Sequence, residues 1–134
     1  MADRVIVDTS VWVDFFHRQE SWLTKQLREL LKRDLAATGD YIIHEVLRGV
    51  RSEPQLLVVR GMMASLPSGT MLGDLHAVRS AMRYRELRRK GVTVRKANDA
   101  IIANYCIEER LPLRTADRDF EPYAEHMGLR LVRQ

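Results

Sequence analysis

The sequence has little cysteine, few histidines and no long apolar run, and each shortage excludes a class of protein. The single cysteine, Cys106, excludes an intrachain disulfide and argues against a cysteine-based zinc site. No apolar stretch approaches the roughly 20 residues that cross a bilayer. Asp3, Arg4 and Asp8 interrupt the start of the chain, where a secretory leader would need an apolar segment. We therefore expect a cytoplasmic protein without a membrane-spanning segment.

The length and apolar content predict one domain over residues 1–134. Of these 134 residues 46% are hydrophobic, which is enough for a buried core, and no repeat or linker divides the chain. The net charge is +4 and comes mainly from arginine, because lysine occurs only at positions 25, 32, 90 and 96. Arginine binds phosphate through two parallel hydrogen bonds, so the charge favours a polyanionic substrate or an acidic partner. A GC-rich coding bias would produce the same excess of arginine.

Short apolar runs alternate with helical patterns along the whole chain. We expect strands at residues 5–7, 35–38, 71–72, 113–116 and 129–132. We expect helices at residues 11–17, from the Ser21 cap to 31, at 41–50, from Ser52 or Glu53 to 66, at 74–90, 97–110 and 120–126. Such alternation predicts a three-layer α/β/α sandwich with a mainly parallel central sheet.

The first strand is the element around which this fold should be organised. Val5, Ile6 and Val7 are consecutive β-branched residues, which is typical of a strand buried on both faces. Asp8 ends the run, and Ser10 is expected to cap a helix that starts at Val11. A carboxylate is thus placed at the carboxyl end of a central strand, where open α/β sheets bind their ligands.

Acidic residues occupy four other notable positions. Asp117 follows a predicted strand as Asp8 does, Asp99 lies in the first turn of a helix, and Glu45 lies off the apolar face of its helix. Asp119 is a further candidate. Taken singly, each has a structural explanation as a cap, a partner of the helix dipole, a solvated side chain or a turn residue. If the two strands are neighbours, however, Asp8 and Asp117 meet at one edge of the sheet.

Carboxylates crowded at one edge repel each other unless a cation or a proton offsets their charge. Mg²⁺ and Mn²⁺ prefer oxygen ligands from a few carboxylates, together with water and substrate phosphate. Such an ion lowers the pKa of bound water and stabilises a leaving oxygen. Zinc would prefer histidine, and the spacing of His17, His44, His76 and His126 does not match a ligand set.

Four short segments resemble, in order, the motifs of the PIN domain family. They are Val7-Asp8-Thr9-Ser10-Val11-Trp12, Glu45-Val46-Leu47-Arg48-Gly49, Ala97-Asn98-Asp99-Ala100-Ile101-Ile102-Ala103 and Thr115-Ala116-Asp117-Arg118-Asp119-Phe120. The resemblance covers essentially the whole chain. More narrowly, the sequence is similar to the VapC ribonuclease toxins of VapBC toxin–antitoxin modules.

This resemblance implies a Mg²⁺- or Mn²⁺-dependent endoribonuclease. The acidic quartet of the family falls on Asp8, Glu45, Asp99 and Asp117, of which Asp8, Asp99 and Asp117 are the implied metal ligands. The supporting positions fall on Thr9, Thr115 and Asp119. Whether Asp117 or Asp119 is the direct ligand stays open, because the last motif offers both.

The implied reaction is hydrolysis of an RNA phosphodiester that leaves a 5′-phosphate and a 3′-hydroxyl. Glu45 would support a ligand water or act as a base. The resemblance also implies inhibition by a VapB-like antitoxin, and assembly as a homodimer or as a toxin–antitoxin hetero-oligomer.

A run of basic residues between positions 79 and 96 leads into the Asp99 motif. Arg83, Arg88, Arg95 and Lys96 are therefore candidates to guide an RNA backbone toward the acids. A solvated charged face is an equally good explanation of the run.

Two other functions compete with a ribonuclease. A non-catalytic nucleic-acid-binding PIN scaffold would tend to lose acids, whereas this chain has all four. A Mg²⁺-dependent hydrolase of other phosphoesters could use Asp8 as a nucleophile, but a haloacid-type enzyme would need a second aspartate at position 10, where Ser10 stands.

Overall fold

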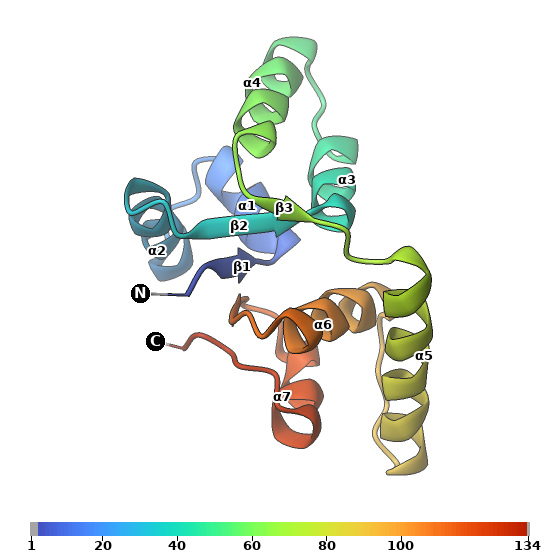
Figure 1. The fold of residues 1–134 in the computed structure, drawn as a ribbon. Coiled ribbons are helices and arrows are strands. Elements are labelled where there is room, and N and C mark those ends of the chain that lie inside the picture. The colour runs from blue at the N-terminus through green and yellow to red at the C-terminus, as the bar shows by residue number, and fades with distance from the viewer. Residues whose placement is uncertain (1–2, 134) are drawn as a thin grey trace.

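The computed structural model describes residues 3–133 and shows a small parallel sheet packed between helices (Figure 1). Within these residues the strands are β1 (Val5–Val7), β2 (Ala36–Gly39), β3 (Ser68–Gly69) and β4 (Leu113–Arg114). The helices are α1 (Thr9–Phe16), α2 (Trp22–Lys32), α3 (Asp40–Arg48), α4 (Glu53–Ala64), α5 (Gly73–Arg89), α6 (Ala97–Glu109), the 3-10 turn η1 (Arg118–Phe120) and α7 (Glu121–Met127). The strand order is β3-β2-β1-β4 and every pairing is parallel. The predicted α/β/α fold with a parallel central sheet is confirmed.

Strand β1 is central and buried, as its β-branched sequence predicts. Ile6 pairs with Ala37 of β2 on one side and with Leu113 of β4 on the other. The N–H of Asp8 donates to the carbonyl of Arg114 at 3.0 Å, which continues the ladder beyond β1. The carboxyl ends of β1 and β4 therefore lie side by side, and the acids that follow them start from adjacent positions.

Two local predictions, the start of the first helix and the strand at residues 71–72, are wrong, and each has a physical reason. Helix α1 begins at Thr9, because the Asp8 carboxylate itself accepts the Thr9 N–H and serves as the N-cap in place of Ser10. The strand expected at residues 71–72 is β3 at Ser68–Gly69 instead, which pairs with the end of β2. Met71 is fully buried, and its N–H is bound by Asp40. Its apolar character therefore reflects core packing and not a strand.

The C-terminal strand expected at residues 129–132 is reduced to one parallel bridge between Leu113 and Leu131. The Leu113 N–H still donates to the Arg130 carbonyl, and the Val132 N–H donates to the Leu113 carbonyl. The segment thus runs along β4 without forming a full strand. The Ser21 and Ser52 caps, by contrast, are both present.

No helix in residues 3–133 is both long and apolar enough to cross a membrane.

The close contact between β3 and α6 predicts that Gly69 is required for stability. A Cβ added at Gly69 would overlap the hydroxyl of Tyr105, which is buried on α6. Gly69→Ala is therefore expected to lower the free energy of unfolding by about 1–3 kcal/mol in urea titrations. The matched control is Gly61→Ala on the exposed side of α4, where a Cβ meets nothing within 4 Å. That change is expected to raise stability by about 0.5–1 kcal/mol. Equal stability of Gly69→Ala and wild type would contradict the β3–α6 contact.

Candidate active site

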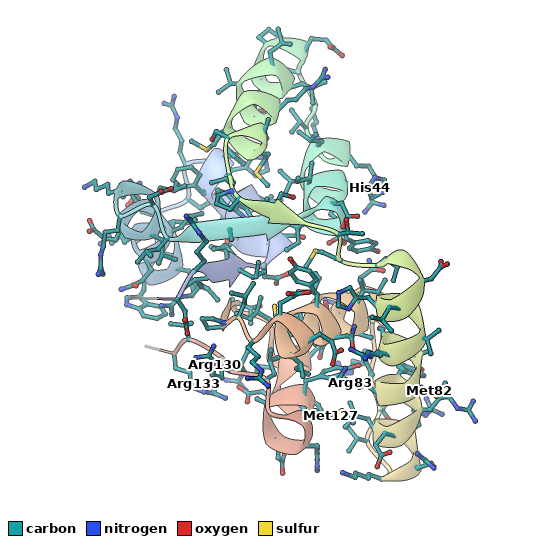
Figure 2. The ribbon with its side chains drawn as sticks, in the orientation of Figure 1. His44, Met82, Arg83, Met127, Arg130 and Arg133 are labelled. Carbon is teal, nitrogen blue, oxygen red and sulfur yellow. The ribbon has the colours of Figure 1, made fainter. Side chains whose placement is uncertain are left out.

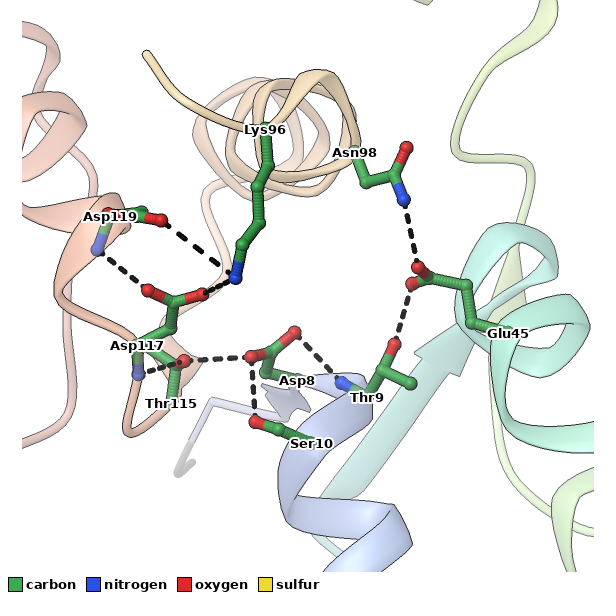
Figure 3. A network of polar contacts seen from close by, with 9 residues as sticks. All are labelled: Asp8, Thr9, Ser10, Glu45, Lys96, Asn98, Thr115, Asp117 and Asp119. Carbon is green, nitrogen blue, oxygen red and sulfur yellow. Dashed lines mark hydrogen bonds and ion pairs between the residues drawn. The ribbon is translucent and has the colours of Figure 1, made fainter. Parts of the chain in front are cut away.

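The acids predicted from the sequence gather at the carboxyl edge of the sheet (Figure 3). Asp8 follows β1 and Asp117 follows β4, while Asp99 lies in the first turn of α6 and Glu45 lies on α3. The parallel pairing of β1 with β4 explains why residues 109 positions apart face each other. The arrangement concentrates negative charge on one side of the molecule.

Asp8 is buried, and the chain itself supplies donors to both of its oxygens. Its Oδ1 accepts the Thr9 N–H at 2.8 Å, and its Oδ2 accepts the hydroxyls of Ser10 at 3.1 Å and Thr115 at 2.9 Å. Burial raises the pKa of Asp8 above its ordinary value, and the hydrogen bond from Thr115 acts in the opposite direction. Asp8 therefore links α1 to the loop after β4 and fixes the position of Thr115.

Asp99, Asp117 and Asp119 offer one carboxylate oxygen each, and these three oxygens lie within 4.8 Å of one another. Asp99 is only 6% exposed, and its Oδ2 has no hydrogen-bond partner within the described chain. Burial, followed by the charges of Asp117 and Asp8, raises the pKa of Asp99 to about 7. A buried carboxylate oxygen without a donor is costly, so this oxygen is available to a cation.

Asp117 is partly buried, and both of its oxygens accept hydrogen bonds from the chain. Its Oδ1 accepts the Asp119 N–H at 2.8 Å, and its Oδ2 accepts from Lys96 Nζ at 3.1 Å. Partial burial acts to raise the pKa of Asp117, but the Asp119 N–H and the Lys96 ammonium outweigh it and hold this pKa below its ordinary value. Asp117 therefore carries a negative charge at neutral pH.

Glu45 stands across the site from Asp117 and outside the three-acid cluster (Figure 3). Its Oε1 accepts the Thr9 hydroxyl at 2.7 Å, and its Oε2 accepts from Asn98 Nδ2 at 3.2 Å. The Thr9 hydroxyl thus links α1 to α3 and lies beside the acidic residues. Asn98 has no role in our sequence-based prediction, although it lies directly before Asp99 in the same motif.

The predicted RNA-binding residues lie in different places. Lys96 contacts the acids, whereas Arg83 of α5 is bound by Glu108 at 2.8 Å and donates to Asn104 on α6. Arg88 and Arg95 are exposed, and Arg88 lies toward the end of α5. Of the four, the structure brings only Lys96 into contact with the acidic cluster.

The donor set fits a divalent cation of the hard class. All three converging groups are carboxylates, one of their oxygens is buried without a donor, and no histidine or cysteine is among them. Mg²⁺ and Mn²⁺ take such ligands and keep waters for the remaining positions.

Comparisons with known proteins agree with this geometry. The family model described as the PIN domain matches residues 5–126. The chain belongs to the PIN domain family. Two curated PIN-domain relatives are a VapC ribonuclease of Mycobacterium bovis and ribonuclease VapC11 of Mycobacterium tuberculosis. Each is 30% identical over 127 residues, covering 93% of this chain and 95% of the relative. These relatives support a nuclease activity for this PIN domain.

Solved structures show the same fold. The DNA-bound VapBC2 complex of Rickettsia felis matches with a TM-score of 0.75 and 18% identity, covering 96% of each chain. The DNA-bound VapBC complex of Salmonella typhimurium matches with a TM-score of 0.75 and 19% identity, covering 98% of each chain. At these identities the likeness is one of PIN fold.

The raised pKa of Asp99 predicts a distinct pH dependence of stability in the metal-free protein. Below about pH 4 the Asp99 carboxyl is neutral in both the folded and the unfolded chain. Between about pH 4 and 7 this carboxyl loses its proton only in the unfolded chain, so the free energy of unfolding falls as the pH rises. Asp99→Asn does not titrate. Its melting temperature is therefore expected to exceed that of wild type by about 5 °C at pH 8, with the difference shrinking toward pH 4. Thermal unfolding in chelator checks this, and a difference independent of pH would contradict it.

Proposed function

We propose that this protein is a Mg²⁺- or Mn²⁺-dependent endoribonuclease that acts in the cytoplasm as the toxin of a toxin–antitoxin pair. The observation that carries this proposal is the convergence of one oxygen each from Asp99, Asp117 and Asp119, together with a buried Asp99 oxygen that lacks a donor. The VapC ribonuclease relatives support RNA as the substrate.

Each acid has a role that follows from its surroundings. Asp99, Asp117 and Asp119 would hold the cation, which lowers the pKa of a water and offsets charge on the reacting phosphate when it is bound. Asp8 has donors on both oxygens, so it holds Thr115 in place and contributes negative charge close to the cluster. Since Asp117 and Asp119 each offer an oxygen to the cluster, both would share in holding the cation.

Glu45 is placed to handle the proton of an attacking water. Its carboxylate is held by Thr9 and Asn98, which keep it pointed toward the site without burying it completely. A base must lie within hydrogen-bond reach of the proton that it accepts, so in this role Glu45 would accept the proton of a water held between α3 and the cluster.

A protein partner is supported by exposed apolar side chains on α4 and α5. Leu57 and Val58 of α4 are 70% and 69% exposed, and Leu75, Val78 and Met82 of α5 are similarly open. Figure 2 shows Met82 on the outward side of α5. Large apolar groups gathered on a surface mark interaction sites. We assign these helices to contacts with a VapB-like antitoxin or a second copy of the chain.

Mapping the ends of the cleaved RNA tests the proposed function. Purified protein with Mg²⁺ or Mn²⁺ should cut cellular RNA to fragments with 5′-phosphate and 3′-hydroxyl ends, and chelator should stop the reaction. A 2′,3′-cyclic phosphate product that persists in chelator would contradict the proposal. RNA binding without cleavage would indicate a scaffold, and turnover of p-nitrophenyl phosphate without RNA cleavage would indicate another phosphoester hydrolase.

A further inference from the structure

Lys96 places a positive charge directly on the acidic cluster. Its Nζ lies 3.1 Å from Asp117 Oδ2 and 3.9 Å from Asp119 Oδ2, while its side chain is 59% exposed (Figure 3). Among residues 3–133, Lys96 is the one lysine or arginine that forms an ion pair with these two aspartates. It is the N-cap residue of α6 and stands three residues before Asp99, so its backbone lies within one helical turn of that acid while its side chain extends toward solvent.

This ion pair is too weak and too incomplete to be a permanent part of the fold. One ammonium faces three carboxylates, and it does not reach Asp99 Oδ2, which keeps no donor. Exposed ion pairs contribute little to stability because the long lysine side chain loses freedom when it is held. A divalent cation carries twice the charge of the ammonium, and Asp99, Asp117 and Asp119 would hold it together, so it would compete with Lys96 for the same carboxylates.

We propose that Lys96 has two partners in turn: it neutralises Asp117 and Asp119 in the metal-free protein, and it contacts a phosphate oxygen of the RNA once a cation has taken its place. This inference rests on the proposed ribonuclease function, and it assigns Lys96 as a contact to the phosphate at the cleavage site.

The position of Lys96 favours phosphate as its second partner. When it leaves Asp117, the ammonium can move only as far as its four-carbon stem allows, so it stays beside the cluster. A substrate phosphate directed to the cation would lie within that range and would present unpaired negative oxygens. Lysine is a compact point charge with rotatable donors and binds phosphate without a fixed fork geometry. Contact at this position would offset the charge that develops on the reacting phosphate.

The two roles predict opposite effects of one substitution. Lys96→Met removes the competing charge, so Mn²⁺ binding without RNA is expected to tighten by about three- to tenfold, as counted from free Mn²⁺ by electron paramagnetic resonance. The same variant at saturating Mn²⁺ is expected to cleave RNA at least about tenfold more slowly under single-turnover conditions. Lys96→Arg, which keeps the charge, is expected to restore both values substantially.

Lys32→Met provides the matched control. Lys32 is also an exposed lysine paired with a carboxylate, Glu29, but it lies on α2 away from the cluster. It should change neither Mn²⁺ affinity nor cleavage. Weaker Mn²⁺ binding by Lys96→Met would overturn the first role, and unchanged cleavage at saturating Mn²⁺ would overturn the second. If wild type binds Mn²⁺ but cleaves no RNA, the ribonuclease proposal fails, while the Mn²⁺ comparison still decides whether Lys96 competes with the cation.

Discussion

Asp99→Asn is expected to lower RNA cleavage by more than about 100-fold and to leave the fold intact. Loss of a residue that merely supports a metal ligand typically costs 10–100-fold, so loss of a ligand charge should exceed that range. Asparagine has nearly the same shape as aspartate, and Asp99 Oδ2 makes no hydrogen bond that the change would break. The substitution removes a charge that burial disfavours, so the metal-free variant should unfold at a higher temperature at neutral pH.

Single-turnover cleavage and Mn²⁺ binding should be measured on the same preparation of Asp99→Asn. Asp14→Asn on the exposed side of α1 is the matched control, because it makes the same chemical change outside the cluster. It should keep wild-type cleavage and Mn²⁺ affinity. Cleavage by Asp99→Asn within tenfold of wild type would remove Asp99 from the metal site.

Trp12→Ala is expected to lower the free energy of unfolding by about 3–5 kcal/mol, which is a large part of the stability of a small domain. Trp12 is fully buried, stacks on Phe16 with ring centroids 5.9 Å apart and meets the edge of Phe15. All three rings lie on α1, and Trp12 anchors this helix in the core; α1 carries Asp8 as its N-cap and Thr9 as the hydrogen-bond partner of Glu45. The site thus depends on packing behind it.

Trp12→Phe tests how much an aromatic ring at this position contributes to stability. The indole Nε1 has no acceptor within the described residues, so phenylalanine removes an unpaired donor while it keeps an aromatic ring. Urea unfolding should show a smaller loss for Trp12→Phe than for Trp12→Ala. Equal losses of unfolding free energy in the two variants would mean that the phenyl ring of Trp12→Phe adds no stability, and would contradict the expected contribution of the stacked ring.

The meeting of Asp8 with Asp117 could be predicted because it follows from chain order and parallel pairing. A β-branched run before Asp8 and a second apolar run before Asp117 suffice to place both at one edge of a sheet. Asp99 could be predicted as a site residue because it lies in the first turn of a helix. Its burial and its free Oδ2 depend on packing among α6, η1 and the strands, which sequence patterns do not contain.

The basic run shows why charge patterns alone could not identify an RNA surface. Arg83 and Lys96 are both basic residues of the same run, and the sequence does not distinguish their roles. In the structure α5 packs on α6 and Glu108 binds Arg83, whereas Lys96 at the start of α6 contacts Asp117. Figure 2 shows Arg83 on the inner side of α5, facing α7. Met71 is a similar case, since its apolar side chain fills the core beside Gly39 and does not mark a strand.

Locating Mn²⁺ by anomalous X-ray scattering in crystals of the wild-type protein tests the metal site most directly. The proposed site predicts one or two strong peaks among the carboxylates of Asp99, Asp117 and Asp119, with Lys96 Nζ moved away from Asp117. Peaks elsewhere on the molecule, or none at saturating Mn²⁺ with the Lys96–Asp117 pair unchanged, would contradict it.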